Sequence, residues 1–286
     1  MTEKQQAPSS SPSSSGSVYV TDHNPAVVRT HRWRTASNSA AHLLPHLRPD
    51  MAVLDVGCGP GTITVDLARN HVPGGHVTGV ECVPDPLDAA REHAAQLGVT
   101  NVDFVVADVL DLRAGGFEDG SFDVVHAHQV LQHVKDPVQA LREMRRVAKA
   151  SGGIVSLRES ASMTWYPRLP GLDRWYDLYL RVARARGGNP DPGSYLHVWA
   201  QKAGFEREKM VCSAGTWCFS SEEDRRWWSG VWAERVVSEA FVRSALEAGV
   251  CKDKSELEEI AEAWREWGRC RDGWFVVTHG EVVCWK

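Results

Sequence analysis

The sequence predicts an α/β fold that is built around a mostly parallel sheet. Between residues 50 and 157, short apolar runs alternate with segments whose apolar residues recur at helical spacing. A glycine-rich turn follows the first apolar run, and Asp-Pro pairs at 85–86 and 136–137 mark the starts of two helices. Strands that alternate with helices in this way pair in parallel through right-handed crossovers.

The N-terminal segment is expected to be a tail followed by a helical cap. Residues 1–17 are rich in Ser, Pro and Gln, and this composition buries too little apolar surface to offset the entropy of ordering. We therefore expect a disordered tail over 1–17 and a cap over 18–48. Within the cap, prolines near both ends delimit a helix over 25–47.

The segment 49–160 holds the regular alternation of strands and helices. Gly98 ends the second helix of this segment, and Gly152-Gly153 turns the chain into its fifth strand. The expected strands are 53–56, 77–80, 102–106, 122–126 and 154–157, and the expected helices are 62–70, 85–97 and 136–148.

The regular alternation of strands and helices does not continue in the segment 161–286. Eleven of the 12 tryptophans follow residue 160, and Trp33 is the exception. We therefore expect the parts of the chain before and after residue 160 to have different functions. We expect helices over 171–186 and 195–203, helices that begin at Ser221 and at a capping box on Ser255, and strands over 205–212 and 273–285.

Composition excludes several classes of function. The 37 acidic and 32 basic residues give a net charge of −5, which disfavours nucleic acid as a partner. No apolar run approaches the ~18 residues of a membrane span, and the N-terminus lacks the apolar core of a signal peptide. The 7 cysteines are dispersed without a CxxC pair, which is typical of reduced thiols and disfavours a metal site. We expect a cytoplasmic protein that binds no membrane, nucleic acid or metal.

The glycine-rich turn runs from Asp55 to Thr62. Its position after the first strand is where open α/β sheets bind ligands, and glycine lets a ligand approach the backbone. The spacing G-x-G-x-G ends at Gly61, whereas a dinucleotide fingerprint needs the third glycine at position 62. Pro60 also removes an N–H donor. A nicotinamide-dependent reductase is thus disfavoured but stays an alternative.

Two acidic residues follow the next two strands. Glu81 closes the second strand, 24 residues after Gly57, and a carboxylate there can accept both hydroxyls of a ribose. Asp108 follows the third strand, where it can accept from an adenine amino group while Val109 offers a backbone N–H. The ordered set of turn and acids predicts a nucleoside ligand.

These motifs resemble those of a known family. The stretches VLDVGCGPGT, GVE, ADV, FDVVHAHQVLQHV and ALREMRRVAKASGG are similar to class I S-adenosylmethionine-dependent methyltransferases, and most to the ubiquinone/menaquinone-biosynthesis-like small-molecule subgroup, which includes enzymes of secondary metabolism. The resemblance covers about 50–160. One departure is the stretch Ala150-Ser151-Gly152-Gly153, where the family usually has a proline before the two glycines.

The resemblance implies a Rossmann-like three-layer sandwich with seven strands, an antiparallel last strand and helical insertions that form a lid. It also implies S-adenosylmethionine as the cofactor. Glu81 would hold the ribose, and Asp108 and Val109 would hold the adenine. His126 would face the methionine end near the sulfonium. The methionine part would be lined by Asp55, Gly57, Gly59 and Gly61.

The cap helix offers a further cofactor contact. Arg34 has a guanidinium that can pair with the methionine carboxylate. The other interpretation is that Arg34 lies on a solvated helix face.

Methyl transfer from a sulfonium is an in-line displacement that needs orientation and exclusion of water, and a base only for a protonated acceptor. His128 and His133 are the candidate bases, because histidine titrates near neutrality. They can equally pack beneath the site. Arg158 and Glu159, expected to end the fifth strand, are candidates for substrate contact.

The tryptophan-rich part is the expected acceptor pocket, for a flat, apolar or cationic molecule. The alternative is that most of these rings form a core. No Asp/Asn-Pro-Pro-Tyr sequence follows the fourth strand, which leaves a small-molecule acceptor as the expectation, with a protein acceptor as the weaker alternative. A monomer or homodimer is expected. A catalytically silent cofactor-binding scaffold is the second hypothesis. The candidate pocket residues are Trp165, Tyr166, Trp175, Trp217, Trp227, Trp228 and Trp232.

Overall fold

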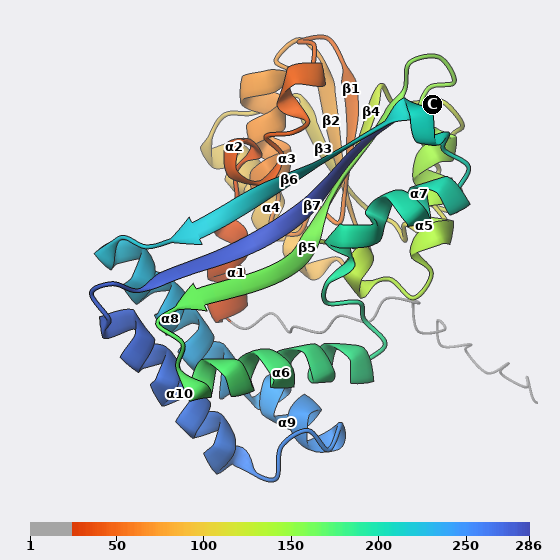
Figure 1. Cartoon of the computed structure of the whole chain (residues 1–286). Helices are drawn as coiled ribbons and strands as arrows, with labels where there is room; N and C mark the ends of the chain where they lie inside the picture. The colour runs from red at the N-terminus through yellow and green to blue at the C-terminus, as the bar shows by residue number, and fades with distance from the viewer. Residues whose placement is uncertain (1–24) are drawn as a thin grey trace, which may run out of the picture.

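A computed structural model describes residues 25–286, so the expected tail over 1–17 lies outside the described residues. Seven strands form one sheet in the order β3-β2-β1-β4-β5-β7-β6 (Figure 1). β7 runs antiparallel to both of its neighbours, and the other pairs are parallel. The strands are β1 (Ala52–Val56), β2 (His76–Glu81), β3 (Val102–Val106), β4 (Val124–His128), β5 (Ile154–Tyr166), β6 (Met210–Phe219) and β7 (Trp274–Trp285).

Helices cover both faces of the parallel part of the sheet (Figure 1). On one face lie α3 (Thr62–Asp66), which continues as a π-helical turn over Leu67–His71, and α4 (Asp85–Gln96). On the other face lie α5 (Pro137–Val147) and α7 (Leu196–Lys202). The three-layer arrangement predicted from the sequence is confirmed.

The start of α5 illustrates why the local sequence forms these elements. Asp136 caps the helix by accepting a hydrogen bond from the backbone N–H of Gln139 at 2.9 Å. Pro137 occupies the first helical position, where a missing N–H costs nothing. The apolar stripe that follows is buried against β4 and β5, because Leu141 and Met144 pack in one cluster with Val125 and Val155.

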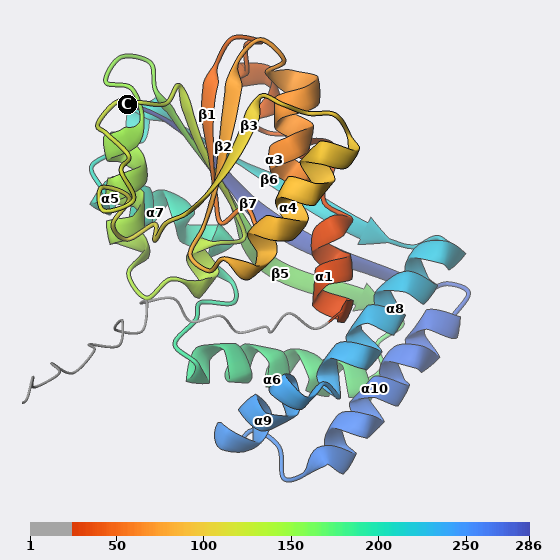
Figure 2. The same ribbon diagram turned by 180° about the vertical axis from the view of Figure 1, so that it is seen from behind.

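A second, helical lobe surrounds the far ends of β5, β6 and β7, which extend beyond the body of the sheet (Figures 1 and 2). Its core is aromatic. The Trp175 ring is fully buried, with its centroid 4.6 Å from that of Trp232 and 4.7 Å from that of Trp264. The lobe comprises α6 (Pro170–Ala185), α8 (Glu222–Val236), α9 (Glu239–Glu247) and α10 (Lys254–Arg269).

The cap is broken into pieces, whereas the sequence predicts one helix over 25–47. The pieces are α1 (Pro25–Arg32), α2 (Ala36–Ser39) and a 3-10 turn over Leu44–His46. Thr35 interrupts the helix because its side chain caps α2 in a reciprocal pair with Asn38. α1 then lies along α8, where Arg29 pairs with Glu234 (Figure 2).

Strand limits differ from the predicted ones in ways that matter for the site. β4 spans Val124–His128 where a strand over 122–126 was expected, so His128 lies within the strand and not after it. β5 continues to Tyr166, which puts Arg158 and Glu159 in its interior. This extension is possible because β7 pairs with β5 along its whole length, a long-range contact that the local pattern does not encode.

Two further boundaries are corrected in the second half. β6 spans Met210–Phe219 where a strand over 205–212 was expected. α10 is capped by Asp253, whose side chain accepts from the backbone N–H groups of Ser255 and Glu256, so the expected cap at Ser255 is wrong. Ser221 caps α8 as predicted. The short 3-10 turns are Leu131–His133, Pro192–Tyr195 and Arg207–Lys209.

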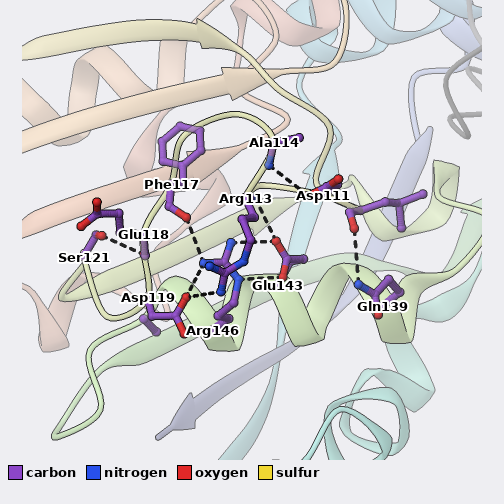
Figure 3. A network of polar contacts seen from close by, with 12 residues as sticks. Asp111, Arg113, Ala114, Phe117, Glu118, Asp119, Ser121, Gln139, Glu143 and Arg146 are labelled. Atoms are coloured by element: carbon purple, nitrogen blue, oxygen red, sulfur yellow. Dashed lines mark hydrogen bonds and ion pairs between the residues drawn. The ribbon is translucent and has the colours of Figure 1, made fainter.

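A surface network ties the loop between β3 and β4 to α5 (Figure 3). Arg146 donates to Glu143 and to Asp119, and Arg113 pairs with Asp119 as well. None of these side chains lines the cavities described below. Within residues 25–286, no helix has both the length and the apolar character that a bilayer crossing requires.

Candidate functional site

The glycine-rich turn adopts the left-handed backbone conformation at Gly57, Gly59 and Gly61, with φ of 66°, 51° and 75°. A Cβ on Gly59 would meet no atom within 4 Å, so this side of the turn is open. A Cβ on Gly61 would lie 2.7 Å from the Cβ of Ala90 on α4. Gly61 therefore packs closely against α4, and it lines none of the three cavities described below.

Three adjoining cavities open at the carboxyl ends of the strands, with volumes of about 530, 550 and 690 Å³. The first lies between the turn and the ends of β2 and β3, the second between the turn and α1, and the third between α1 and the helical lobe. Gln129 and His133 line all three. The cavities thus form one branched site.

The first cavity contains the two predicted acids. Glu81 is buried, and its carboxylate accepts from the backbone N–H of Gly59 at 3.3 Å and from that of Cys82 at 2.8 Å. Asp108 is half-buried and accepts from the backbone N–H of Leu110 at 2.9 Å. Val109 lines the same cavity. The cavity therefore offers fixed carboxylates to a ligand that carries hydroxyl and amino groups.

The second cavity brings Asp55 and Arg34 together with the turn. Thr64 donates a hydrogen bond to Asp55 at 2.6 Å, and burial raises the pKa of Asp55 to about 7. Arg34, on the segment between α1 and α2, donates to the side-chain oxygen of Gln129 at 2.6 Å. Arg34 therefore faces the site and does not lie on a solvated helix face.

Gln129 is a site residue that the sequence did not single out. It follows β4 and has a φ of 55°, the left-handed region that a residue with a Cβ seldom occupies. Its side-chain amide lies 3.1 Å from the ring Nε2 of His279, and its backbone N–H donates to Arg158. The only signal in the sequence is its place at a strand end, since backbone strain leaves no mark in composition.

The histidines of β4 differ in their surroundings. His126 is fully buried, with its Nδ1 3.2 Å from the hydroxyl of Ser156, and lines none of the three cavities. The expectation that it faces the methionine end is therefore not met. His128 lines the second cavity and His133 all three. Burial lowers the pKa of His133 to about 4 and that of His128 well below its usual value, so both are neutral at pH 7.

Arg158 and Glu159 line none of the three cavities. They stabilise the segments next to these cavities. Arg158 donates to Glu281 on β7 at 3.0 Å. One oxygen of Glu159 accepts from the backbone N–H groups of Val130 and Leu131 at 2.7 and 2.6 Å, which fixes the turn after Gln129. Burial raises the pKa of Glu159 to about 8.

The aromatic residues divide between the third cavity and the core of the lobe. Trp165 and Trp175 are buried in the core. Trp33 was not among the candidates, yet its ring packs on that of Trp217 at 5.2 Å, since the cap folds onto the lobe. The rings that line the third cavity are Trp33, Tyr179, Trp217, Trp228 and Trp232.

Comparisons with known proteins identify the family of this chain. A family model for a methyltransferase domain matches residues 47–182. An uncharacterized methyltransferase of Schizosaccharomyces pombe is 37% identical over 90% of this chain and 92% of its own length. The probable methyltransferase ltbC of Aspergillus luteorubrus is 30% identical over 94% of this chain and 97% of its own length.

Among solved structures, a candidate methyltransferase of Bacillus halodurans C-125 superposes with a TM-score of 0.54 at 20% identity, covering 86% of this chain and 97% of that chain. This likeness establishes the fold. The relationships over nearly the full length establish the family. The chain belongs to the methyltransferase family, and it is a methyltransferase with a class I fold.

Proposed function

We propose that this methyltransferase takes its methyl group from S-adenosylmethionine and transfers it to a small organic acceptor. The observation that carries the proposal is the junction of the three cavities at Gln129 and His133. A nucleoside, an amino acid and an acceptor can each occupy one branch, with their reacting ends close together.

The residues of the first two cavities fit the cofactor. Glu81 is suited to accept from the ribose hydroxyls, and Asp108 and Val109 are suited to the adenine edge. The open side of Gly59 leaves room for the methionine part. The guanidinium of Arg34 suits its carboxylate.

The protein's contribution is to orient the reactants and exclude water. When bound, the sulfonium supplies the methyl group: a lone pair of the acceptor bonds to the methyl carbon as the carbon–sulfur bond breaks, and that electron pair stays on sulfur. His133 is the better placed of the two candidate bases, because it lines the third cavity as well as the first two. Its low pKa makes it a weak base, suited only to an acceptor with an acidic proton; an acceptor that is already ionised needs no base.

The acceptor is expected to be small because the third cavity lies between α1 and the helical lobe, with buried rings on its walls. Secondary metabolites are the acceptors to screen first, since the subgroup that the sequence resembles includes enzymes of secondary metabolism.

Calorimetry with S-adenosylhomocysteine tests the cofactor half of this proposal. The substitution Glu81→Ala should weaken binding by about 1–3 kcal/mol, because two hydrogen bonds to the ribose are lost. As the matched control, Glu92→Ala removes an exposed acid of α4 and should leave affinity unchanged. Equal binding by the Glu81→Ala variant and the parent would remove Glu81 from the cofactor site, and no binding by the parent would refute the proposed function.

A further inference from the structure

Two residues of β5, Ser160 and Met163, line the third cavity. Ser160 is 4% exposed and lines neither of the other two cavities. The two residues are three positions apart, and in a regular strand an odd separation places side chains on opposite faces. β5 must therefore depart from regular pairing between them.

The departure is a β-bulge. Ser160 pairs with His279 of β7 and Ser162 pairs with the adjacent Thr278, so Ala161 is an extra residue in β5. The extra residue reverses the alternation of side chains, which allows Ser160 and Met163 to face the same cavity. Bulges occur next to ligand sites, where they change the direction of a side chain.

Close packing holds the bulge in place. The 3-10 turn Pro192–Tyr195 lies against it, and a Cβ on Gly193 would be 2.5 Å from the backbone oxygen of Glu159 and 3.0 Å from the Cβ of Ala161. The backbone next to Ser160 therefore has little room to move. A side chain on such a backbone is preorganised for a ligand, which lowers the entropic cost of binding.

The hydroxyl of Ser160 is available to a ligand. In the part of the chain that the structure describes, it forms no hydrogen bond. The indole N–H groups of Trp228 and Trp232, which also belong to the walls of the cavity, are enclosed without a partner and offer no donor to its interior. The bulge thus presents a polar group among apolar rings.

Tyr179 of α6 brings a second hydroxyl to the same cavity. It too forms no hydrogen bond to any of the described residues. Burial raises the pKa of Tyr179, so its hydroxyl keeps the proton near pH 7 and can donate it to an oxygen of a ligand.

These hydroxyls make the cavity selective among aromatic ligands. A hydrocarbon ring that displaced water would leave them buried without a partner, which costs free energy. A ring that carries an oxygen restores a hydrogen bond, because a hydroxyl of serine can donate as well as accept. The aromatic walls and the hydroxyls together favour a flat ligand with a polar edge.

We propose that Ser160 is a specificity-determining residue, and that the methyl acceptor is an aromatic compound whose ring carries a hydroxyl or carbonyl oxygen bound by the Ser160 hydroxyl. This assignment rests on the proposed function, which makes the third cavity the acceptor site. The bulge of β5 is then the feature that directs Ser160 to the acceptor.

Equilibrium dialysis of the full chain tests this with two matched probes, naphthol and methylnaphthalene, that carry their substituent at the same ring carbon. The parent should bind naphthol about fivefold or more tightly, because only naphthol can form the hydrogen bond. Ser160→Ala should abolish this preference by weakening naphthol binding while the affinity for methylnaphthalene is retained. A purely structural role of Ser160 would change both affinities alike.

Ser162→Ala is the matched control, since Ser162 is an exposed residue on the other side of the bulge. It should keep the preference of the parent, and the melting temperature of each variant reports on folding. Equal binding of the two probes by the parent, or a preference that survives in Ser160→Ala, would overturn the role of Ser160. If the preference is lost only in Tyr179→Phe, the oxygen is bound by Tyr179 instead. Failure of both probes to bind would overturn the aromatic acceptor.

Calorimetry with S-adenosylhomocysteine on the same samples separates this inference from the proposed function. If the preference for naphthol depends on Ser160 and S-adenosylhomocysteine does not bind, the proposed methyl donor is wrong while the aromatic site stands. If S-adenosylhomocysteine binds and the preference is absent, the proposed donor stands and the role of Ser160 is wrong.

Discussion

The proposed cofactor side and the proposed acceptor side of the site are shaped by different means. Around the first two cavities, the backbone conformation determines the shape. Gly57 and Gly59 lie in the left-handed region, and the Glu81 carboxylate accepts hydrogen bonds from backbone N–H groups. Around the third cavity, the shape comes from large rings on α8, β6 and the cap. A site that is shaped by the backbone requires particular residues within a short stretch of sequence. A site that is lined by aromatic rings requires only large side chains, which distant segments can supply.

This difference explains why the resemblance fades after residue 160 while the fold continues. Many combinations of aromatic side chains can enclose a cavity of similar volume, so each enzyme can change its acceptor without changing its cofactor loop. It also predicts that mutations in the two regions act on different quantities, stability in the lobe and ligand affinity at the turn.

The largest effect is expected for Trp175→Ala. The Trp175 ring is fully buried at the centre of the lobe and lines none of the three cavities. Its removal should lower the free energy of unfolding by about 3–5 kcal/mol, because a large cavity remains. Denaturant titration measures this, and S-adenosylhomocysteine affinity of the folded variant should match that of the parent. Trp274→Ala, at a ring that is 42% exposed, is the control. A loss for Trp175→Ala no larger than that of the control would contradict the assignment.

Gly59→Arg should mainly lower the affinity for the ligand and should lower stability only modestly, the reverse of what is expected for Trp175→Ala. The new side chain would fill the open side of the turn and lower the affinity for S-adenosylhomocysteine about 100-fold or more, by analogy with the loss of a well-formed contact. The strained backbone adds a stability cost of about 1–2 kcal/mol.

Gly98→Arg is the matched control, since Gly98 has a φ of 66° and equally open surroundings but lies after α4, away from the three cavities. It should show the stability cost without the loss of affinity. Similar affinities for the two arginine variants would mean that the turn is not the cofactor site.

A change in the pH dependence of stability is expected at Glu159, which lies where the two regions join. Its pKa is about 8 in the folded protein against an ordinary 4.5, so the folded state binds its proton more tightly. The stability that it contributes is fully present below pH 4.5 and is lost as the pH rises to about 8. Glu159→Gln, which stays neutral, should flatten the stability profile over this window.

Melting temperatures at pH 5 and pH 8 measure this effect, and about 2–4 °C corresponds to each 1 kcal/mol. Glu143→Gln is a control of opposite sign, because the hydrogen bond from Arg146 holds the pKa of Glu143 below its ordinary value. Its contribution is lost only on acidification, so its profile between pH 5 and 8 should match the parent's. Parallel profiles for Glu159→Gln and the parent would show that Glu159 is ionised in the fold.

The elements that depend on short-range sequence signals were predicted well. The first three strands, α4, α5 and α6 lie close to their expected ranges, because their caps, prolines and apolar stripes are short-range signals. The turn and the two acids could be placed for the same reason: each follows directly on a strand of the parallel sheet. The predicted antiparallel last strand is confirmed as β7.

What the sequence by itself determined is the parallel core, the glycine-rich turn and the order of the residues along it, since these depend on neighbours in the chain. Only the tertiary structure decided that β5 runs on to Tyr166, that His126 is enclosed, and that Trp33 and Gln129 line the site. Each of these depends on contacts between segments more than 30 residues apart, such as the pairing of β5 with β7 and the packing of the cap on the lobe. Such contacts are fixed by the packing of the whole chain, and no local pattern records them.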